Sequence, residues 1–150
     1  MEDEEFVRHL YNVLRLCREK WVPAILVGLS AGPLRRGDIL DTLRSHSLPG
    51  EWSEKNTQLH DSVLETTLKM LTAAGMLARQ EYPNTFPPKV IYRLTPAARS
   101  AVEAMRPMAA WARDHPEVIG RAQRYKRGRV GPDPAAGQVI GDTVWSGRAG

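Results

Sequence analysis

Apolar residues recur every three or four positions at the start of the chain. From Glu4 to Trp21 this spacing predicts an amphipathic helix, and the acidic residues at its start suit the positive end of a helix dipole. The apolar stripe of this helix consists of Phe6, Leu10, Val13, Cys17 and Trp21. Such a stripe packs either within its own chain or against a second copy of the chain, and the pattern leaves both arrangements open.

Two shorter helices are expected next. Pro23 suits the first turn of a helix, and the nearly continuous apolar run that follows it ends at Gly32-Pro33. Residues 34–45 then place apolar side chains on one face and arginines and aspartates on the other. This pattern predicts a third helix with one side facing solvent.

A fourth helix is expected over residues 61–74, after a stretch rich in Ser, Pro, Gly and Asn over residues 47–57 that predicts an extended turn. Three leucines share the buried face of this helix: Leu64, Leu68 and Leu71. Glu65 is placed to support a capping arrangement at the start of the helix. Gly75 ends it, as a glycine of positive φ commonly does.

After Gly75 the apolar period changes from that of a helix to that of a strand. Residues 76–82 and 89–94 are short, partly alternating runs typical of β-strands. The prolines between them lack the amide donors that a strand ladder needs, so the intervening residues form a hairpin tip. The sequence therefore predicts a β-hairpin over Ala78 to Thr95.

A further helix follows the hairpin, with Thr95 as its N-cap and Pro96 in its first turn. Its apolar side includes Met105, Met108 and Trp111, and it is expected to end near His115-Pro116. From there on apolar residues become sparse while glycine, proline and arginine accumulate. Residues 116–150 are therefore expected to form a basic, disordered tail.

The composition is that of an ordinary globular domain, with 42% hydrophobic and 25% charged residues in a chain of 150. Cys17 is the only cysteine, and the four dispersed histidines lack the spacing of metal ligands. The sequence contains neither a glycine-rich phosphate loop nor a serine elbow. We therefore expect no catalytic site, no metal site and no cofactor. With no apolar run of bilayer length and no basic signal sequence, the chain is expected in the cytoplasm.

The order of the elements indicates more about function than the charge does. A formal charge of +4 favours a polyanionic partner only weakly. Helix, helix, turn, helix, hairpin and helix is, however, the order of a winged helix-turn-helix, in which the helix after the turn enters the DNA major groove. The outward residues expected to approach DNA from this helix are Ser62, Val63, Thr66, Thr67, Lys69 and Met70. Arg79 and Lys89 of the hairpin are expected to contact phosphates.

Each of these residues has a plainer alternative. Ser62 can serve only as a helix cap, and Thr66 and Thr67 can simply be solvated. Glu65 would repel phosphates, so we expect it to cap the helix or to pair with Lys69 four residues on.

The segment from Phe86 to Thr95 closely resembles the wing-to-helix signature of the HxlR-type winged helix-turn-helix regulators. The pair Lys20-Trp21 ahead of Ile25-Leu26, the leucine frame up to Gly75, and the spacing onward to Trp111 resemble the same family. The fold implied is mainly α with a small β-hairpin: a winged helix-turn-helix over residues 21–115, with dimerisation helices at both ends and the first within residues 1–20.

The function implied is that of a sequence-specific, double-stranded-DNA-binding regulator, expected to be a repressor, which acts as a homodimer on a near-palindromic operator and associates with the nucleoid. The alternative is a winged-helix protein-interaction module that has lost operator binding. The residues expected at the dimer interface are Phe6, Leu10, Val13, Cys17, Met105, Met108 and Trp111. Some of them can instead line a cleft for a small-molecule effector, which the sequence does not identify.

The sequence also departs from this family. Members commonly carry a cysteine about a dozen residues before the Lys-Trp pair, where this chain has Arg8 and His9, so a redox role is not transferred to Cys17. Arg18-Glu19 replaces two glycines, and the first helix is therefore expected to run on further than usual.

Two more departures lie around the third helix. Arg36 stands where an aromatic is common, which leaves Leu34 or Trp52 to fill the core. The stretch from Arg44 to Leu59 exceeds the family's short turn and is either functional or a tolerated insertion. In the tail, the basic residues from Arg121 to Arg129 form either an arm that binds DNA or a solubilising end.

Overall fold

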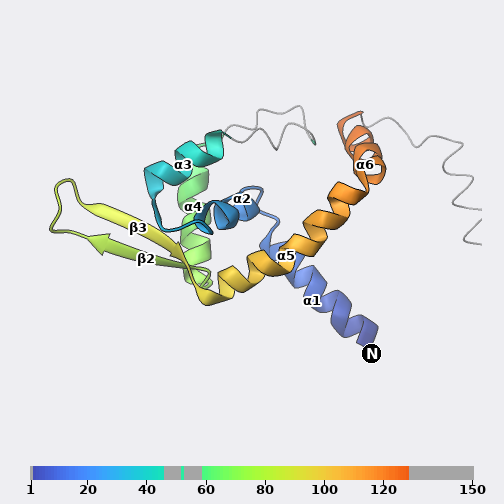
Figure 1. Cartoon of the computed structure of the whole chain (residues 1–150), viewed down its shortest axis with the longest axis horizontal. Coiled ribbons are helices and arrows are strands. Elements are labelled where there is room, and N and C mark those ends of the chain that lie inside the picture. Colours follow the sequence, from blue (N-terminus) through green and yellow to red (C-terminus); the bar gives the residue numbers. More distant parts are fainter. Residues whose placement is uncertain (1, 46–51, 53–58, 129–150) are drawn as a thin grey trace, which may run out of the picture.

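The computed structural model describes residues 2–45, 52 and 59–128 (Figure 1). The helices are α1 (Glu2–Leu16), α2 (Val22–Leu29), α3 (Arg36–Arg44), α4 (Asp61–Ala73), α5 (Pro96–Asp114) and α6 (Pro116–Gly128). The strands are β1 (Leu34–Arg35), β2 (Leu77–Tyr82) and β3 (Lys89–Leu94). The hairpin of β2 and β3 projects from one side of the helical centre, and the far ends of α1 and α5 lie on the other (Figure 1). In the described part of the chain, no helix combines the length and apolar character needed to cross a bilayer.

The three strands form an antiparallel sheet in the order β1-β3-β2. β2 and β3 pair from Leu77 opposite Leu94 to Tyr82 opposite Lys89, which confirms the predicted hairpin. β1 pairs with the other edge of β3 and places Leu34 opposite Tyr92. The sequence assigned residues 34 and 35 to a helix, and that assignment is wrong because a two-residue strand is too short to show alternation.

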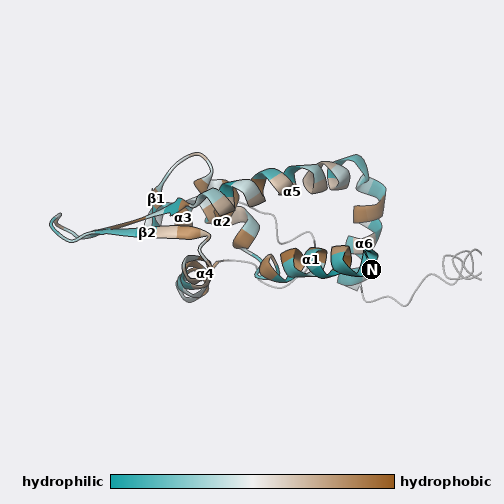
Figure 2. Cartoon of the chain, turned by 90° about the horizontal axis from the view of Figure 1, so that it is seen from below, coloured by the Kyte–Doolittle hydropathy of each residue, from teal (hydrophilic) through white to brown (hydrophobic). Residues whose placement is uncertain are grey.

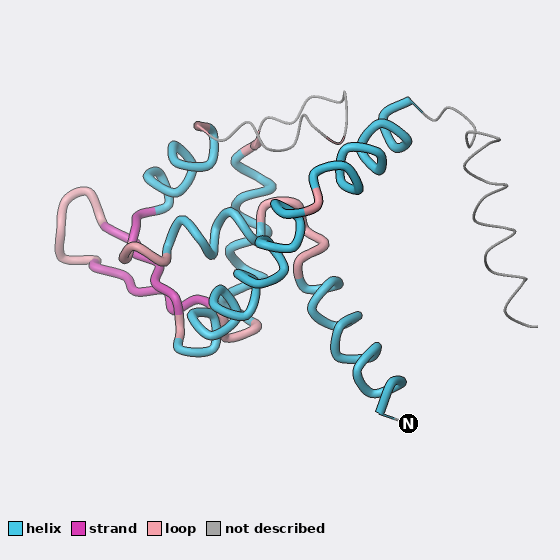
Figure 3. The backbone as a smooth tube through the Cα atoms, turned by 45° about the vertical axis from the view of Figure 1, so that its right-hand side comes forward, coloured by secondary structure: helices cyan, strands magenta, loops and turns pink. Residues whose placement is uncertain are grey.

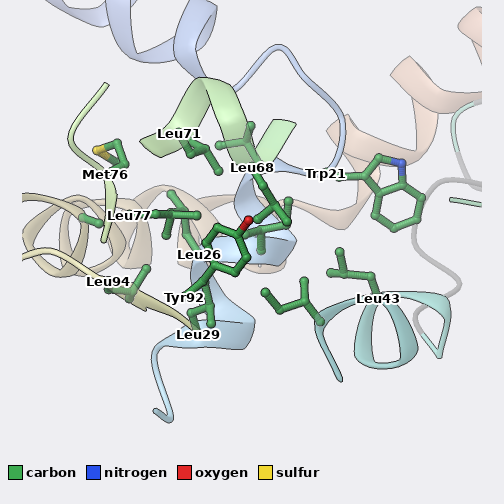
Figure 4. Close-up of a cluster of buried hydrophobic side chains, with 14 of the residues drawn as sticks. Trp21, Leu26, Leu29, Leu43, Leu68, Leu71, Met76, Leu77, Tyr92 and Leu94 are labelled. Atoms are coloured by element: carbon green, nitrogen blue, oxygen red, sulfur yellow. The ribbon is translucent and has the colours of Figure 1, made fainter. Parts of the chain in front are cut away.

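The hydrophobic core lies where α2, α4 and the sheet meet, and it also takes in residues of α3 and α5. Within this cluster the Tyr92 ring lies among Leu26, Leu29 and Leu77, drawn from one helix and one strand (Figure 4). Trp21 closes one end of the cluster and is only 7% exposed. Each fully buried leucine contributes about 1.5–3 kcal/mol relative to an exposed one. The leucine face predicted for α4 is confirmed as buried.

The C-terminal end of α4 is closed by a Schellman turn around Gly75. The amide of Met76 donates to the Leu71 carbonyl at 2.9 Å, and that of Gly75 donates to the Thr72 carbonyl at 3.1 Å. Gly75 has φ of +78°, in the left-handed region that the sequence predicted for it. Thr95 links this turn to α5. Its hydroxyl donates to the Gly75 carbonyl at 2.6 Å and also accepts from the amide of Ala98 at the start of α5.

The first helix ends earlier than predicted. α1 stops at Leu16, the chain turns over residues 17–21, and Trp21 is the N-cap of α2 (Figure 3). The expectation that this helix runs on further than usual is therefore wrong. Both Cys17 and Trp21 pack against the core, so the apolar spacing persists after the backbone has left the helix.

The prediction of disorder is wrong for residues 116–128, which form α6, while residues 129–150 lie outside the described residues. Pro116 suits the first turn of a helix, Glu117 lies near its positive end, and Lys126 and Arg127 lie near its negative end. α6 buries none of its residues, which is why its sequence is so polar.

The predictions about the segment around the third helix have different outcomes. Leu34 packs against the core as expected, whereas the Trp52 side chain is 42% exposed. Of the Arg44–Leu59 stretch, residues 46–51 and 53–58 lie outside the described residues.

The Schellman turn predicts the effect of replacing its glycine. Gly75→Ala should lower the free energy of unfolding by about 1–2 kcal/mol, because an L-residue pays that cost in the left-handed region. No atom lies within 4 Å of the added methyl group, so the cost is that of the backbone alone. Gly37→Ala is the matched control, since Gly37 is helical and equally uncrowded, and it should stabilise the fold by about 0.5–1 kcal/mol. Equal midpoints for the two variants in urea unfolding would contradict the left-handed conformation assigned to Gly75.

The burial of Cys17 predicts that its thiol reacts slowly with alkylating reagents. Burial raises the pKa of the Cys17 thiol above its ordinary value, so less thiolate is present at neutral pH than in a free cysteine. In the folded protein the reaction with iodoacetamide at pH 7 should be slower than in the urea-unfolded chain, and the rate should rise only at higher pH. An equal rate in the two states would show that burial does not protect the thiol.

Candidate nucleic-acid interface

The outer face of α4 presents four exposed side chains that the sequence predicted to face outward, Ser62, Val63, Thr66 and Lys69. The leucines on the opposite face of α4 are buried, so the rotation of the helix is fixed. The Thr66 hydroxyl donates to the Ser62 carbonyl at 2.9 Å, which leaves its lone pairs free to accept a further hydrogen bond. Val63 is 40% exposed and offers an apolar contact on the same face.

Two residues predicted to face outward do not. Thr67 is 3% exposed, and its hydroxyl donates to the Val63 carbonyl at 2.8 Å. Met70 is partly buried and packs against the core. The burial of Thr67 can be predicted from the sequence, because Thr67 lies three residues after Leu64 and four before Leu71 and therefore on their face of the helix.

The start of α4 also differs from the prediction. His60 is the N-cap and makes no side-chain capping hydrogen bond, so the capping arrangement expected with Glu65 is wrong. Glu65 instead forms an ion pair with Lys69 at 4.0 Å, as the other alternative predicted. It forms a closer pair, at 3.0 Å, with Arg36 of α3, a residue that the sequence did not connect with this site.

The hairpin holds its cationic side chains in defined positions. Arg79 on β2 pairs with Glu81 at 2.5 Å, and hydrogen bonds to Glu81 and Tyr92 raise the pKa of the Arg79 guanidinium. Lys89 is partly buried at the start of β3. Beyond it, the tip exposes the whole Phe86 side chain.

A hollow of about 340 Å³ lies between α4 and the hairpin and brings together Lys69, which the sequence predicts to approach DNA, and Arg79, which it predicts to contact phosphates. Its lining residues are Glu65, Lys69, Thr72, Ala73, Arg79 and Tyr92. A second hollow of about 230 Å³ gathers four of the α4 residues that the sequence predicts to approach DNA, and its lining residues are Glu19, Ser62, Val63, Thr66 and Thr67. Lys89 lines neither hollow, and the sequence did not point to Glu19 or Tyr92.

The residues expected at a dimer interface lie on the far side of the molecule and fall into two groups. Cys17 and Met105 pack against the chain's own core, and Leu10 is partly buried. The others are exposed apolar side chains, with exposed fractions of 66% for Phe6, 40% for Val13, 49% for Met108 and 51% for Trp111. Trp111 stacks on His115 with ring centroids 4.7 Å apart. Figure 2 shows the apolar residues of α1 and α5 along these two helices.

Several solved structures share this fold. A transcriptional regulator of the MarR family from Enterococcus faecalis V583 is similar with a TM-score of 0.59, 20% identity, and coverage of 76% of this chain and 91% of that chain. The regulator ytfH from Salmonella typhimurium has a TM-score of 0.54 and 27% identity over 76% of this chain and 90% of its own. The reduced form of the transcriptional regulator YodB from B. subtilis has a TM-score of 0.53 and 27% identity, over 69% of this chain and 88% of its own.

No curated protein matches the chain in sequence. The sequence model of the HxlR-like helix-turn-helix family matches residues 16–119, which run from the end of α1 into α6 and include α4 and the hairpin. Because this match covers more than half of the chain, the chain belongs to the HxlR-like helix-turn-helix family.

Proposed function

We propose that this protein is a sequence-specific, double-stranded-DNA-binding transcriptional repressor that acts as a homodimer on a near-palindromic operator. In this proposal α4 enters the major groove and the hairpin follows the sugar-phosphate backbone. The observation that carries it is the exposed polar face of α4 beside the hollow where Lys69 and Arg79 gather. The family match and the similar structures, which are transcriptional regulators, support the same function.

The two hollows suggest a division of roles. The Ser62 hydroxyl can both donate and accept, and the Thr66 hydroxyl, which donates within α4, can accept. The Val63 methyl groups suit the methyl group of thymine, so this part of α4 would contact base edges. Lys69 and Arg79, together with Lys89 on the hairpin, would contact phosphates and set the position of the protein on the duplex. Thr67 and Met70 would act only through packing, because both lie against the core.

A second candidate function is a protein-interaction module built on the same fold. The observation that favours it is the weakly charged outer face of α4, where Glu65 offsets Lys69. The two functions differ in selectivity. Repeated selection from a random duplex pool should yield a common sequence under the first function and no enriched sequence under the second.

The assignment of the phosphate-contacting residues predicts the effect of removing their charges. Replacing Lys69, Arg79 and Lys89 together with alanine should weaken binding to the selected duplex at least tenfold. It should also reduce the slope of log affinity against log salt by about 0.9 for each phosphate that the variant leaves without a cationic partner. The measurement is fluorescence anisotropy at several salt concentrations.

The matched control for this variant removes the same charge elsewhere. Arg8, Arg106 and Arg113 are exposed on α1 and α5, away from the hairpin, and replacing all three with alanine should leave the salt slope nearly unchanged. If both triple variants bind alike, the assigned face does not contact DNA.

The proposed homodimer would use α1 and the distal half of α5. α1 has no buried residue in the single chain, yet its apolar side chains form a continuous stripe. Phe6 and Val13 on this stripe, and Met108 and Trp111 on α5, would bury their exposed surface against the same helices of the partner. Two copies of α4 would then face half-sites about one helical turn, ~34 Å, apart.

Substitutions on these helices test the dimer. Phe6→Glu or Trp111→Glu should shift the protein from dimer to monomer in sedimentation velocity, because a charge at the interface stays unpaired. Val27→Glu on α2 is the control, since Val27 is 55% exposed but lies on neither helix of the proposed interface. A dimer that survives both interface variants would show that subunits meet elsewhere.

A further inference from the structure

We propose that Arg36 is a positioning residue for DNA binding, which holds the carboxylate of Glu65 so that Lys69 stays available to a phosphate. This inference rests on the proposed function. Arg36 begins α3, whereas Glu65 and Lys69 lie on α4, so the contact joins the two helices of the helix-turn-helix (Figure 1).

The geometry places Glu65 between two cations at unequal distances. Its Oε2 lies 3.0 Å from the Nε of Arg36, while its Oε1 lies 4.0 Å from the Nζ of Lys69. The Arg36 Nε is buried and lacks hydrogen-bond geometry toward Glu65, so the attraction is that of opposite charges. Lys69 is 77% exposed and is the looser of the two partners.

The consequence lies in the hollow between α4 and the hairpin. Glu65, Lys69 and Arg79 all line it, and a free carboxylate there would repel phosphates and attract the lysine that should bind them. Arg36 adds a positive charge behind the Glu65 carboxylate and so offsets the negative charge that lies beside Lys69. Without Arg36, the only close partner left for Glu65 in the described part of the chain is Lys69.

Arg36 also contacts Asp61, the first residue of α4. One of its terminal nitrogens lies 3.4 Å from the Asp61 carbonyl and 3.6 Å from the Asp61 carboxylate. At the other end of α3, two nitrogens of Arg44 lie 3.4 Å from the Leu59 carbonyl. The two ends of α3 therefore both contact the start of α4 through side chains.

The test compares single and double variants on the duplex that the wild-type chain selects from a random pool. Arg36→Ala should bind it about tenfold more weakly and with a smaller salt slope, because Lys69 then pairs with Glu65. Glu65→Gln should bind at least as tightly as the wild type. In the Glu65→Gln background, Arg36→Ala should change affinity less than twofold, since Lys69 then has no Glu65 carboxylate to pair with and the contacts of Arg36 with Asp61 are long and exposed.

The matched control is the ion pair of Arg106 and Glu103, which has the same 3.0 Å separation and lies within the single helix α5. Arg106→Ala should change neither affinity nor salt slope. Thermal unfolding should show similar midpoints for Arg36→Ala and Arg106→Ala, because both pairs are partly exposed and such pairs stabilise little.

The outcomes separate this inference from the function on which it rests. If the wild type selects no duplex, the proposed function fails. If it selects one but Arg36→Ala binds within twofold, or if Glu65→Gln does not rescue Arg36→Ala, the role given to Arg36 is overturned. Should Arg36→Ala unfold at the assay temperature, Arg36→Lys replaces it: retained charge should keep affinity within threefold, and a tenfold loss would overturn the inference.

Discussion

Leu64, Leu68 and Leu71 bury one face of α4 in the cluster that contains α2 and the sheet, and this burial sets the rotation of α4 about its axis. In a helix each residue advances the direction of the side chain by about 100°, so a fixed inner face also fixes the outer one. Ser62, Val63, Thr66 and Lys69 are exposed for that reason, and Thr67 is not. A DNA-facing surface on α4 therefore depends on the core more than on the surface residues themselves.

The two ends of α4 are held by different means. At the C-terminal end the backbone itself closes the helix through Gly75, and the Thr95 hydroxyl joins that turn to the first residues of α5. At the N-terminal end the N-cap residue His60 makes no side-chain capping hydrogen bond, and Arg36 and Arg44 of α3 contact this end. The first end is set by short-range hydrogen bonds, whereas the second depends on charges that salt can screen.

The sequence predicted those features that short-range patterns determine. The leucine spacing gave α4, the alternating runs around the prolines gave the hairpin, and Thr95-Pro96 gave the start of α5. It failed where an assignment needed tertiary information. Trp21 kept helical spacing although the helix ends at Leu16, since a core can be contacted from a turn as well as from a helix.

The candidate site was harder to predict than the fold for the same physical reason. An ion pair between residues 29 positions apart, such as that of Arg36 and Glu65, leaves no periodic signal in the sequence. Strand β1 and the hollow beside Tyr92 exist only after the chain has folded. The burial of Thr67 was different, because its spacing from Leu64 and Leu71 already placed it on the inner face.

Thr95 gives the arrangement a further physical consequence. It lies where β3 ends and α5 begins, and its hydroxyl donates to the carbonyl of Gly75, the residue whose amide helps to close α4, so a tilt of α5 acts on that turn. Met108 and Trp111 belong to the distal half of α5 and are half exposed, and that end of α5 lies far from the hairpin (Figure 1). Whatever packs against the distal part of α5 thus acts on a helix whose N-cap residue is hydrogen-bonded to the turn that ends α4. A change at the far side of the molecule would therefore reach the end of α4, the helix that we propose to contact DNA, in part through Thr95 and the turn around Gly75.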